Sequence, residues 1–423
     1  MTGSEQSRGS AIARLATVAG LFILLVTASA AQAQTFTVLH TFSGGDGANP
    51  VAGVTLDRQG NLYGTTEYGG AANNGTVFKL SRSGSSWVLA PLYAFTGGTD
   101  GGRPQDAVVF GPNGTLYGTT FVGGNDNDGV VFNLHPQPTR PPAVLSPWVE
   151  TVIHSFAFWN DGAWPFSEVT FDAAGNLYGT TYAGGDNGDD ERVPGGGEAC
   201  YEHCGVVYEL SPSNGGWNET TIFFFTAGTG ANPTAGLAFD SAGNLDGVTA
   251  AAAAAGLGAF YQLMPSASGW TERTVHAILW TDGKYSAATP LVDSSGNLYA
   301  GMNGYSGYYG TYDGNVSHVT TANGQLTPLY SFPPANGPYG GLAMDAAGIL
   351  YGTTNQGGAF NNGVIFELTP MGSGWIYTDL HDFATDDGCQ SMGKVALDAG
   401  GNLYGTTSSC GANNDGTVWE LTP

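Results

Sequence analysis

Carboxylates are the most numerous ionisable side chains in this sequence. The 423 residues include 35 Asp and Glu against 11 Lys and Arg, a formal net charge of −24. One recurring position is held in turn by Gly53, Ala107, Glu168, Gly236, Thr289, Gly341 and Lys394. Only Glu168 and Lys394 are ionisable there, so Glu168 is the candidate for acid–base catalysis. A metal-dependent hydrolase would need several converging carboxylates or histidines, and this position does not supply them.

Two oxygen-rich segments are the candidate metal sites. Asp126 and Asp128 lie in the run NDNDG, and Asp186 and Asp189 lie in DNGDDE. Clustered oxygen ligands suit Ca²⁺. Neither segment has the Asp-x-Asn-x-Asp-Gly spacing, followed by a distant Glu, that marks a calcium loop. We therefore expect solvated turns and no cofactor, with Ca²⁺ binding as the alternative.

Four cysteines lie in two neighbourhoods. Cys389 and Cys410 fall in the last repeat, and Cys200 and Cys204 share the insertion CYEHC. Four cysteines allow three connectivities, of which pairing within each neighbourhood is the simplest. A metal site around Cys200, His203 and Cys204 is the alternative, but no second ligand pair stands at zinc-like spacing.

The elements that position these residues are repeats. The stretch GNLYGTT occupies residues 60–66 and returns at 175–181 and 401–407, with relaxed copies at 114–120, 243–249, 296–302 and 348–354. Seven copies at intervals of about 53 residues indicate a repeat architecture. No helical pattern follows the glycines, as a phosphate-binding loop requires. We expect scaffold instead, with Leu62 and Tyr63 packed between repeats and Gly64 letting backbones approach closely.

Each repeat contains four strand-like runs. In the first repeat these are residues 53–57, 60–66, 75–80 and a run that begins at Trp87. Alternating apolar and polar residues, rich in β-branched and aromatic types, are typical of half-buried strands. Four short antiparallel strands per repeat predict a β-propeller blade. One outer-strand position repeatedly holds histidine, which indicates packing rather than catalysis: His40, His154, His276 and His381.

The two ends of the repeat region predict how the ring closes. Residues 36–42 (FTVLHTF) read as a fourth strand, and residues 416–423 (GTVWELTP) read as a third. Pairing them removes two exposed strand edges. The predicted fold is all-β: a seven-bladed propeller of four-stranded antiparallel blades, closed by the N-terminal strand joining the last blade. Glu168 and Lys394 then belong to blades on roughly opposite sides of the channel.

Aromatic residues gather in the loops that vary most between repeats. Connections from the second to the third strand and from the fourth to the next first strand share one face of a propeller, and variable loops on a rigid scaffold are where binding usually occurs. Flat rings beside Asn and Asp suit stacking on sugars, and they also suit protein contacts. The candidates are Tyr68, Phe121, Trp159, Trp164, Tyr182, Trp280, Tyr285, Tyr308, Tyr309, Tyr339 and Phe360.

The repeat resembles the Gloeo/Verruco-type tandem repeat, or GloVer repeat. Its pattern D-x-x-G-N-L-Y-G-T-T-x-x-G-G-x-x-x-x-G-T-V-F-x-L is matched almost unbroken from Asp57 to Leu80. The resemblance implies an exported repeat protein and no catalytic residues. The fourth and fifth repeats depart from the pattern, with Asp246 in place of the tyrosine and a weak third strand at residues 314–319. A weaker similarity to kelch propellers supports the fold alone.

The first 33 residues have the layout of a secretory signal peptide. Arg8 and Arg14 precede an apolar run, and an Ala-x-Ala site follows at residues 31–33,. The run is shorter than the ~20 residues that a membrane span needs. We therefore expect cleavage near Ala33, one propeller domain over residues 34–423, a monomer without a membrane span, and a secreted or periplasmic location. The negative net charge opposes binding to nucleic acid.

These observations favour a binding protein over an enzyme. The leading hypothesis is a non-enzymatic exported propeller that binds a glycan, a cell-surface polymer or a protein through its variable-loop face. An extracellular polysaccharide lyase or hydrolase that uses Glu168 is the first alternative, and a structural envelope component is the second.

Overall fold

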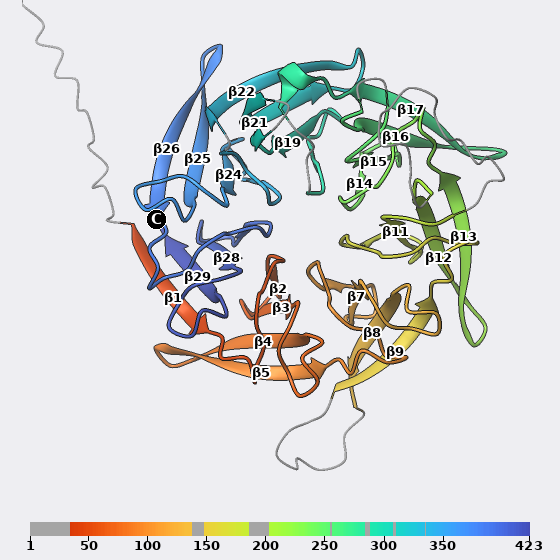
Figure 1. The fold of residues 1–423 in the computed structure, drawn as a ribbon, viewed down its shortest axis with the longest axis horizontal. Helices are drawn as coiled ribbons and strands as arrows, with labels where there is room; N and C mark the ends of the chain where they lie inside the picture. The colour runs from red at the N-terminus through yellow and green to blue at the C-terminus, as the bar shows by residue number, and fades with distance from the viewer. Residues whose placement is uncertain are drawn as a thin grey trace, which may run out of the picture. The chain divides into compact units, whose positions relative to one another are not determined.

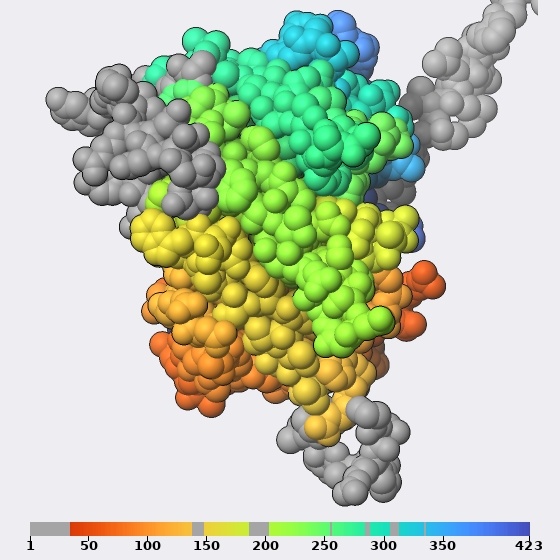
Figure 2. Space-filling view, turned by 90° about the vertical axis from the view of Figure 1, so that its right-hand side faces the viewer, coloured from red at the N-terminus to blue at the C-terminus, as the bar shows by residue number. Residues whose placement is uncertain are grey.

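The computed structural model describes residues 34–137, 148–185, 203–253, 256–283, 288–307, 310–334 and 336–423. Within them the chain forms seven antiparallel sheets that follow one another around a ring (Figure 1). The predicted all-β seven-bladed propeller is confirmed. Seen from the side, residues of successive blades lie next to one another in chain order (Figure 2). No helix in the described part of the chain is long and apolar enough to cross a membrane.

Blades 1 to 4 each contain four strands, which follow one another from the channel outward. Blade 1 is β2 (Thr55–Leu56), β3 (Leu62–Thr66), β4 (Thr76–Ser83) and β5 (Ser86–Ala94). Blade 2 is β6 (Val109–Phe110), β7 (Leu116–Thr120), β8 (Val130–Pro136) and β9 (Trp148–Ser155). Blade 3 is β10 (Thr170–Phe171), β11 (Leu177–Thr181), β12 (Val206–Ser213) and β13 (Gly216–Phe224). Blade 4 is β14 (Ala238–Phe239), β15 (Leu245–Val248), β16 (Ala259–Ser266) and β17 (Gly269–Ala277), followed by the 3₁₀ helix η1 (Trp280–Asp282).

Blades 5 to 7 follow the same plan with two variations. Blade 5 is β18 (Leu291–Val292), β19 (Leu298–Met302), β21 (Gly310–Thr320) and β22 (Gln325–Pro334), and it adds β20 (Tyr305–Gly307) as a hairpin with β21. Blade 6 is β23 (Ala343–Met344), β24 (Leu350–Thr353), β25 (Val364–Met371) and β26 (Gly374–Asp382). Blade 7 is β27 (Ala396–Leu397), β28 (Leu403–Thr407), β29 (Thr417–Thr422) and β1 (Thr35–Thr41). Of the two repeats that depart from the sequence pattern, only the fifth gains a strand.

The ring closes as predicted. Strand β1 pairs antiparallel with β29, from Thr35 opposite Thr422 to Thr41 opposite Thr417. The first and last strands of the described chain therefore share one sheet, and the outer edge of β29 is covered.

The repeated stretch is scaffold, as expected, although its glycine makes room for a ring rather than for backbone. Tyr63 packs edge-on against Phe110 of blade 2, with ring centroids 5.2 Å apart, which confirms packing between blades. A Cβ on Gly64 would lie 2.5 Å from Cζ of Phe78 in the adjacent strand. The same relation holds between Gly118 and Phe132, at 2.7 Å.

In most blades, the turn between the first two strands is stabilised by hydrogen bonds to an aspartate, and these turns lie at one end of the propeller. Oδ1 of Asp172 accepts hydrogen bonds from the backbone N–H groups of Ala174 and Asn176, at 2.9 and 2.8 Å. Oδ2 accepts a third from the Asn176 amide at 2.8 Å. Equivalent Oδ1 bonds form at Asp57, Asp240, Asp293, Asp345 and Asp398. We call this the turn end of the propeller.

The other end carries the variable loops, and the recurring histidines help to hold them. Nε2 of His154 lies 2.8 Å from Oδ2 of Asp161, while Oδ1 of Asp161 accepts the N–H of Ala157. His40, His276 and His381 make the same pairing with Asp46, Asp282 and Asp387. The structural role expected for these histidines is therefore observed. We call this the cavity end, because its loops surround a central cavity.

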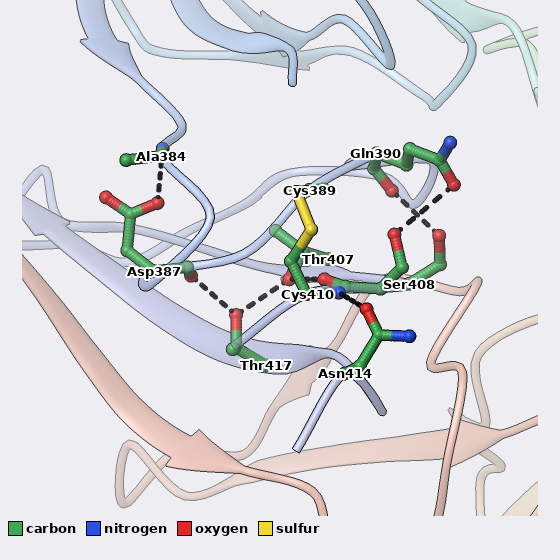
Figure 3. The surroundings of a disulfide bond; sticks show 10 residues. Ala384, Asp387, Cys389, Gln390, Thr407, Ser408, Cys410, Asn414 and Thr417 are labelled. Atoms are coloured by element: carbon green, nitrogen blue, oxygen red, sulfur yellow. Dashed lines mark hydrogen bonds between the residues drawn. A yellow bond between two sulfur atoms is a disulfide. The ribbon is translucent and has the colours of Figure 1, made fainter. Parts of the chain in front are cut away.

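A disulfide reinforces the cavity end of blade 7. Cys389 bonds to Cys410, with Cα atoms 5.3 Å apart and a sequence separation of 21 residues (Figure 3). Their loops also pair through Cys389 and Ser409. This confirms one predicted pairing. Cys204 is disulfide-bonded as well, and Cys200, the partner predicted for it, lies outside the described residues.

Candidate functional site

The loops of the cavity end surround a central cavity of about 1150 Å³. Two positions that recur in several repeats contribute to its wall. One lies in the connection that enters a blade, and the other follows the blade's second strand. In the third repeat they are Trp164 and Tyr182, and in the first they are Asn49 and Glu67.

The entering position has a similar backbone conformation in several repeats, whereas its side chain varies among Asn, Arg, Trp and Gln. Trp164 has φ 58°, a left-handed conformation that is unusual for a bulky residue,. Its N–H donates to the carbonyl of Asp128 at 2.8 Å, and its carbonyl accepts the N–H of Tyr182 at 3.1 Å. Asn49 makes equivalent bonds to Asp415 and Glu67. Positive φ recurs at Asn49, Arg103, Asn232 and Gln390. The backbone is fixed, and the side chain is free to differ.

Blades 2 and 3 line their part of the cavity with aromatic rings. The rings of Trp164 and Phe121 lie 5.9 Å apart, those of Phe121 and Phe166 4.8 Å, and those of Phe166 and Tyr182 5.3 Å. All four residues line the cavity and are half-buried. We call them the aromatic wall.

Loops of blades 1 and 7 contribute polar groups instead. Asn49, Glu67, Gln105, Gln390 and Ser408 line the cavity, and the Gln105 amide donates to Glu67 at 2.8 Å. Blade 4 adds Thr234, whose buried Oγ1 has no hydrogen-bond partner among the described residues. A buried hydroxyl without a partner is costly to stability.

Besides the aromatic wall and the polar groups, the cavity contains a cluster of three ionisable side chains, which we call the charged cluster. Nζ of Lys394 lies 3.9 Å from Oε2 of Glu168, and Asp106 accepts the backbone N–H groups of Ala107 and Glu168 at 2.7 and 2.6 Å. All three side chains line the cavity. The sequence places Glu168 and Lys394 on distant blades and gives no sign that they converge, but the structure brings their side chains together.

Glycines explain why the ring is narrow enough for this contact. A Cβ on Gly53 would lie 2.1 Å from the carbonyl oxygen of Lys394, and one on Gly236 would lie 2.7 Å from that of Glu168. Small residues at the recurring position thus let neighbouring first strands approach, and the two long side chains meet. Asp106, one residue before this position, was not among the predicted site residues. Comparison of the adjacent position, which is otherwise Ala52, Ser167, Ala235, Ala288, Gly340 and Gly393, could have found it.

The protonation of Asp106 is perturbed by its surroundings. Burial raises the pKa of Asp106 well above its usual range, and the negative charge of Glu168 raises it further,. The two backbone N–H donors and Lys394 act in the opposite direction without outweighing these effects. The carboxyl group is therefore poised to hold or release a proton near neutral pH.

The structure places the predicted site residues in different parts of the molecule. Phe121, Trp164, Tyr182, Tyr339 and Glu168 line the cavity. Trp159, Trp280 and Phe360 are exposed, with relative accessibilities of 60%, 41% and 60%, and none of them is among the lining residues of the cavity. Tyr68 lies beneath the guanidinium of Arg103, 5.3 Å from its ring centroid. Tyr285, Tyr308 and Tyr309 lie outside the described residues.

The candidate metal ligands do not form a cluster in the described part of the chain. Asp128 accepts the N–H of Phe158 at 3.2 Å, and no group of three or more His, Cys, Asp or Glu side chains is arranged to hold a metal ion among the described residues. Asp126 therefore has no such set of partners there. Asp186 and Asp189 lie outside the described residues.

The chain belongs to the Gloeobacter/Verrucomicrobia repeat family, whose sequence profile matches residues 25–190 and 195–419. No curated protein matches it at a significant level.

Several solved structures share the fold at low identity. A putative 6-phosphogluconolactonase from Bacteroides uniformis is 12% identical, with a TM-score of 0.52 over 85% of this chain and 90% of that one. An oligogalacturonate lyase from Vibrio parahaemolyticus is 9% identical, with a TM-score of 0.52 over 92% and 93%. A chain of the mitotic checkpoint complex is 10% identical, with a TM-score of 0.52 over 92% and 95%. At such identities these similarities show the fold alone.

Proposed function

We propose that this protein binds a carbohydrate in its central cavity. The observation that carries the proposal is the pairing of an aromatic wall with a polar region inside one cavity of about 1150 Å³. Ring faces pack against the C–H faces of sugars, while amides and carboxylates hydrogen-bond to hydroxyl groups. Drug-sized ligands occupy roughly 300–1,000 Å³, so this cavity is large enough for several sugar rings.

The fixed backbone of the entering position also supports a binding role. Asn49, Trp164, Asn232 and Gln390 are held in similar left-handed conformations, although the Trp164 side chain differs from the three amides in size and polarity. A position that served only the scaffold would be expected to keep one residue type, as the turn-end aspartates do. Backbone conformations of this kind cluster at ligand sites.

The proposal places the protein outside the cytoplasm as a monomeric binding module. The disulfide of Cys389 and Cys410 would persist in an oxidising compartment, and residues 1–33 read as a leader. N-terminal sequencing of the exported protein tests this location. A mature chain that begins near Gln34 supports it, and retention of residues 1–33 in a cytoplasmic fraction contradicts it.

Hydrolysis is a second candidate function, favoured by the charged cluster. Asp106, with its raised pKa, could donate a proton to the leaving oxygen, while Glu168 beside Lys394 could take a proton from the attacking water,. The glycosidic C–O bond would break, and water would supply the new hydroxyl group. Release of reducing ends distinguishes this reaction from binding alone.

A glycan array probed with the purified protein tests the proposal, with and without Ca²⁺. Trp164→Asn is the decisive variant because Asn49 and Asn232 already occupy the equivalent position with similar φ, so the backbone tolerates it. Trp159→Ala is the matched control, because this exposed ring lies outside the cavity lining. We expect the bound glycan to lose at least about tenfold in affinity in Trp164→Asn, about 1.4 kcal/mol, and to be unaffected in Trp159→Ala. An unchanged affinity in Trp164→Asn, or no glycan bound at all, would overturn the proposal.

A further inference from the structure

Lys394 extends into the cavity and already places an ammonium group there. It precedes β27 of blade 7, whereas its partner Glu168 precedes β10 of blade 3, with Nζ and Oε2 3.9 Å apart. Its stem lies against Gly341, where a Cβ would come within 3.0 Å of Cγ of Lys394. The chain itself therefore shows that an ammonium group fits beside Glu168.

This internal ammonium is held loosely. The Lys394 side chain is 50% exposed, whereas that of Glu168 is 21% exposed. A solvent-exposed ion pair at this distance contributes little, so a competing cation with better geometry can displace Lys394 toward solvent at small cost.

The charge balance of the cavity favours such a competitor. Glu67, Asp106 and Glu168 line it, and Lys394 is the single basic residue among its described lining residues. A ligand cation gains from this excess of carboxylates, and a polyanionic sugar chain is repelled by it. The aromatic wall adds to the preference, since ring faces attract ammonium groups.

We propose that the ligand is an amino sugar of the glucosamine type, whose ammonium group replaces that of Lys394 beside Glu168 and Asp106. This inference rests on the proposed carbohydrate binding and names the class of sugar. The sugar ring would pack on the aromatic wall while its amine reaches the charged cluster.

The test compares a tetramer of glucosamine with its fully N-acetylated counterpart, at mildly acidic pH where the amines are charged. We expect the free-amine tetramer to bind at least about tenfold more tightly. Glu168→Gln should remove this preference, because losing the carboxylate weakens binding of the free-amine tetramer far more than binding of the N-acetylated tetramer. Lys394→Met should strengthen binding of the free amine severalfold, because it removes the internal competitor. Lys79→Met is the matched control, since it makes the same charge change on a lysine that lies over Tyr63 and outside the cavity lining.

The outcomes separate this inference from the function on which it rests. Equal binding of the two tetramers, or no gain in Lys394→Met, would overturn the amino-sugar assignment even if Glu168→Gln failed to fold. If an uncharged glycan bound and lost affinity in Trp164→Asn, carbohydrate binding would stand and only the assignment would fail. If no glycan bound, both would fail. Tight binding of a lysine-rich peptide in place of the tetramer would identify a protein ligand and also overturn the assignment.

Discussion

The two ends of the propeller use repetition in opposite ways. At the turn end, Asp57, Asp172 and Asp398 occur at the same position and make the same hydrogen bonds. At the cavity end, Asn49 and Trp164 share one backbone conformation and present unrelated side chains to the cavity. This difference shows how the sequence of a repeat protein can be interpreted. A repeated residue with a repeated contact is scaffold, whereas a repeated backbone with a changing side chain marks a surface available for function.

Breaking the disulfide should have the largest effect on stability, because it releases the cavity end of blade 7. Opening the loop closed by Cys389 and Cys410, which are 21 positions apart in the sequence, removes about 3 kcal/mol in the chain-entropy model. We expect Cys389→Ser with Cys410→Ser to lower the midpoint of denaturant unfolding accordingly. Reductant should abolish most of the difference between wild type and variant. A variant as stable as oxidised wild type would show that the loops of Gln390 and Ser408 do not depend on the bridge.

Replacing a glycine that packs against a buried aromatic ring should have the next largest effect on stability. A Cβ on Gly118 would lie 2.7 Å from Cζ of Phe132, and Phe132 is fully buried. We expect Gly118→Ala to cost about 2 kcal/mol through overpacking, measured by chemical denaturation. Gly45→Ala is the control, because a Cβ there meets nothing within 4 Å. Equal stability of the two variants would contradict the packing described for the repeated stretch.

Removing one turn-end aspartate should have a smaller effect, confined to stability. Asp172→Ala leaves the N–H groups of Ala174 and Asn176 without their carboxylate acceptor. Since water reaches this turn, we expect a loss of about 1 kcal/mol and an unchanged affinity for the cavity ligand. Altered binding in this variant would break the separation between the two ends.

The smallest effect should be the pH dependence of the turn end. Burial alone would raise the pKa of Asp57, but hydrogen bonds from Asn61, Gln59 and Tyr63 outweigh it and lower that pKa below the usual value for an aspartate. A lowered pKa in the folded state gives stability that is present above pH ~4 and is lost as the pH falls through the folded pKa. We expect Asp57→Asn to cost about a few tenths of a kcal/mol near neutrality. This difference from wild type should shrink in thermal melts below pH ~4, and one that grew on acidification would contradict the assignment.

Most of the scaffold could be predicted, because each sequence pattern that determines it is local and recurs in every or nearly every repeat. The GNLYGTT stretch, the Asp turns and the strand-like ends fix the blades, their number and the closure of β1 on β29. The contact between Gly64 and Phe78 was harder to predict from the sequence, because the ring of Phe78 comes from the adjacent strand.

The site was only partly predictable, because it depends on distances across the ring. Local patterns identified Phe121, Trp164, Tyr182 and Tyr339 as loop aromatics, but they could not separate these from the exposed Trp159 and Phe360. The meeting of Lys394 with Glu168 depends on how closely the glycine-lined first strands approach. Asp106 stands out among the small residues at its repeat position, but its burial beside Glu168 depends on the folded structure.

Hydrogen exchange with and without the glycan found on the array tests the central claim most directly. We expect the added protection to be confined to the cavity end, in the loops between β7 and β8 and between β9 and β10, and at Tyr182 after β11. The turns at residues 57–61 and 172–176 should exchange equally in both states. Protection concentrated at those turns or along the outer strands, with the cavity loops unchanged, would contradict the assignment of the site to the cavity end.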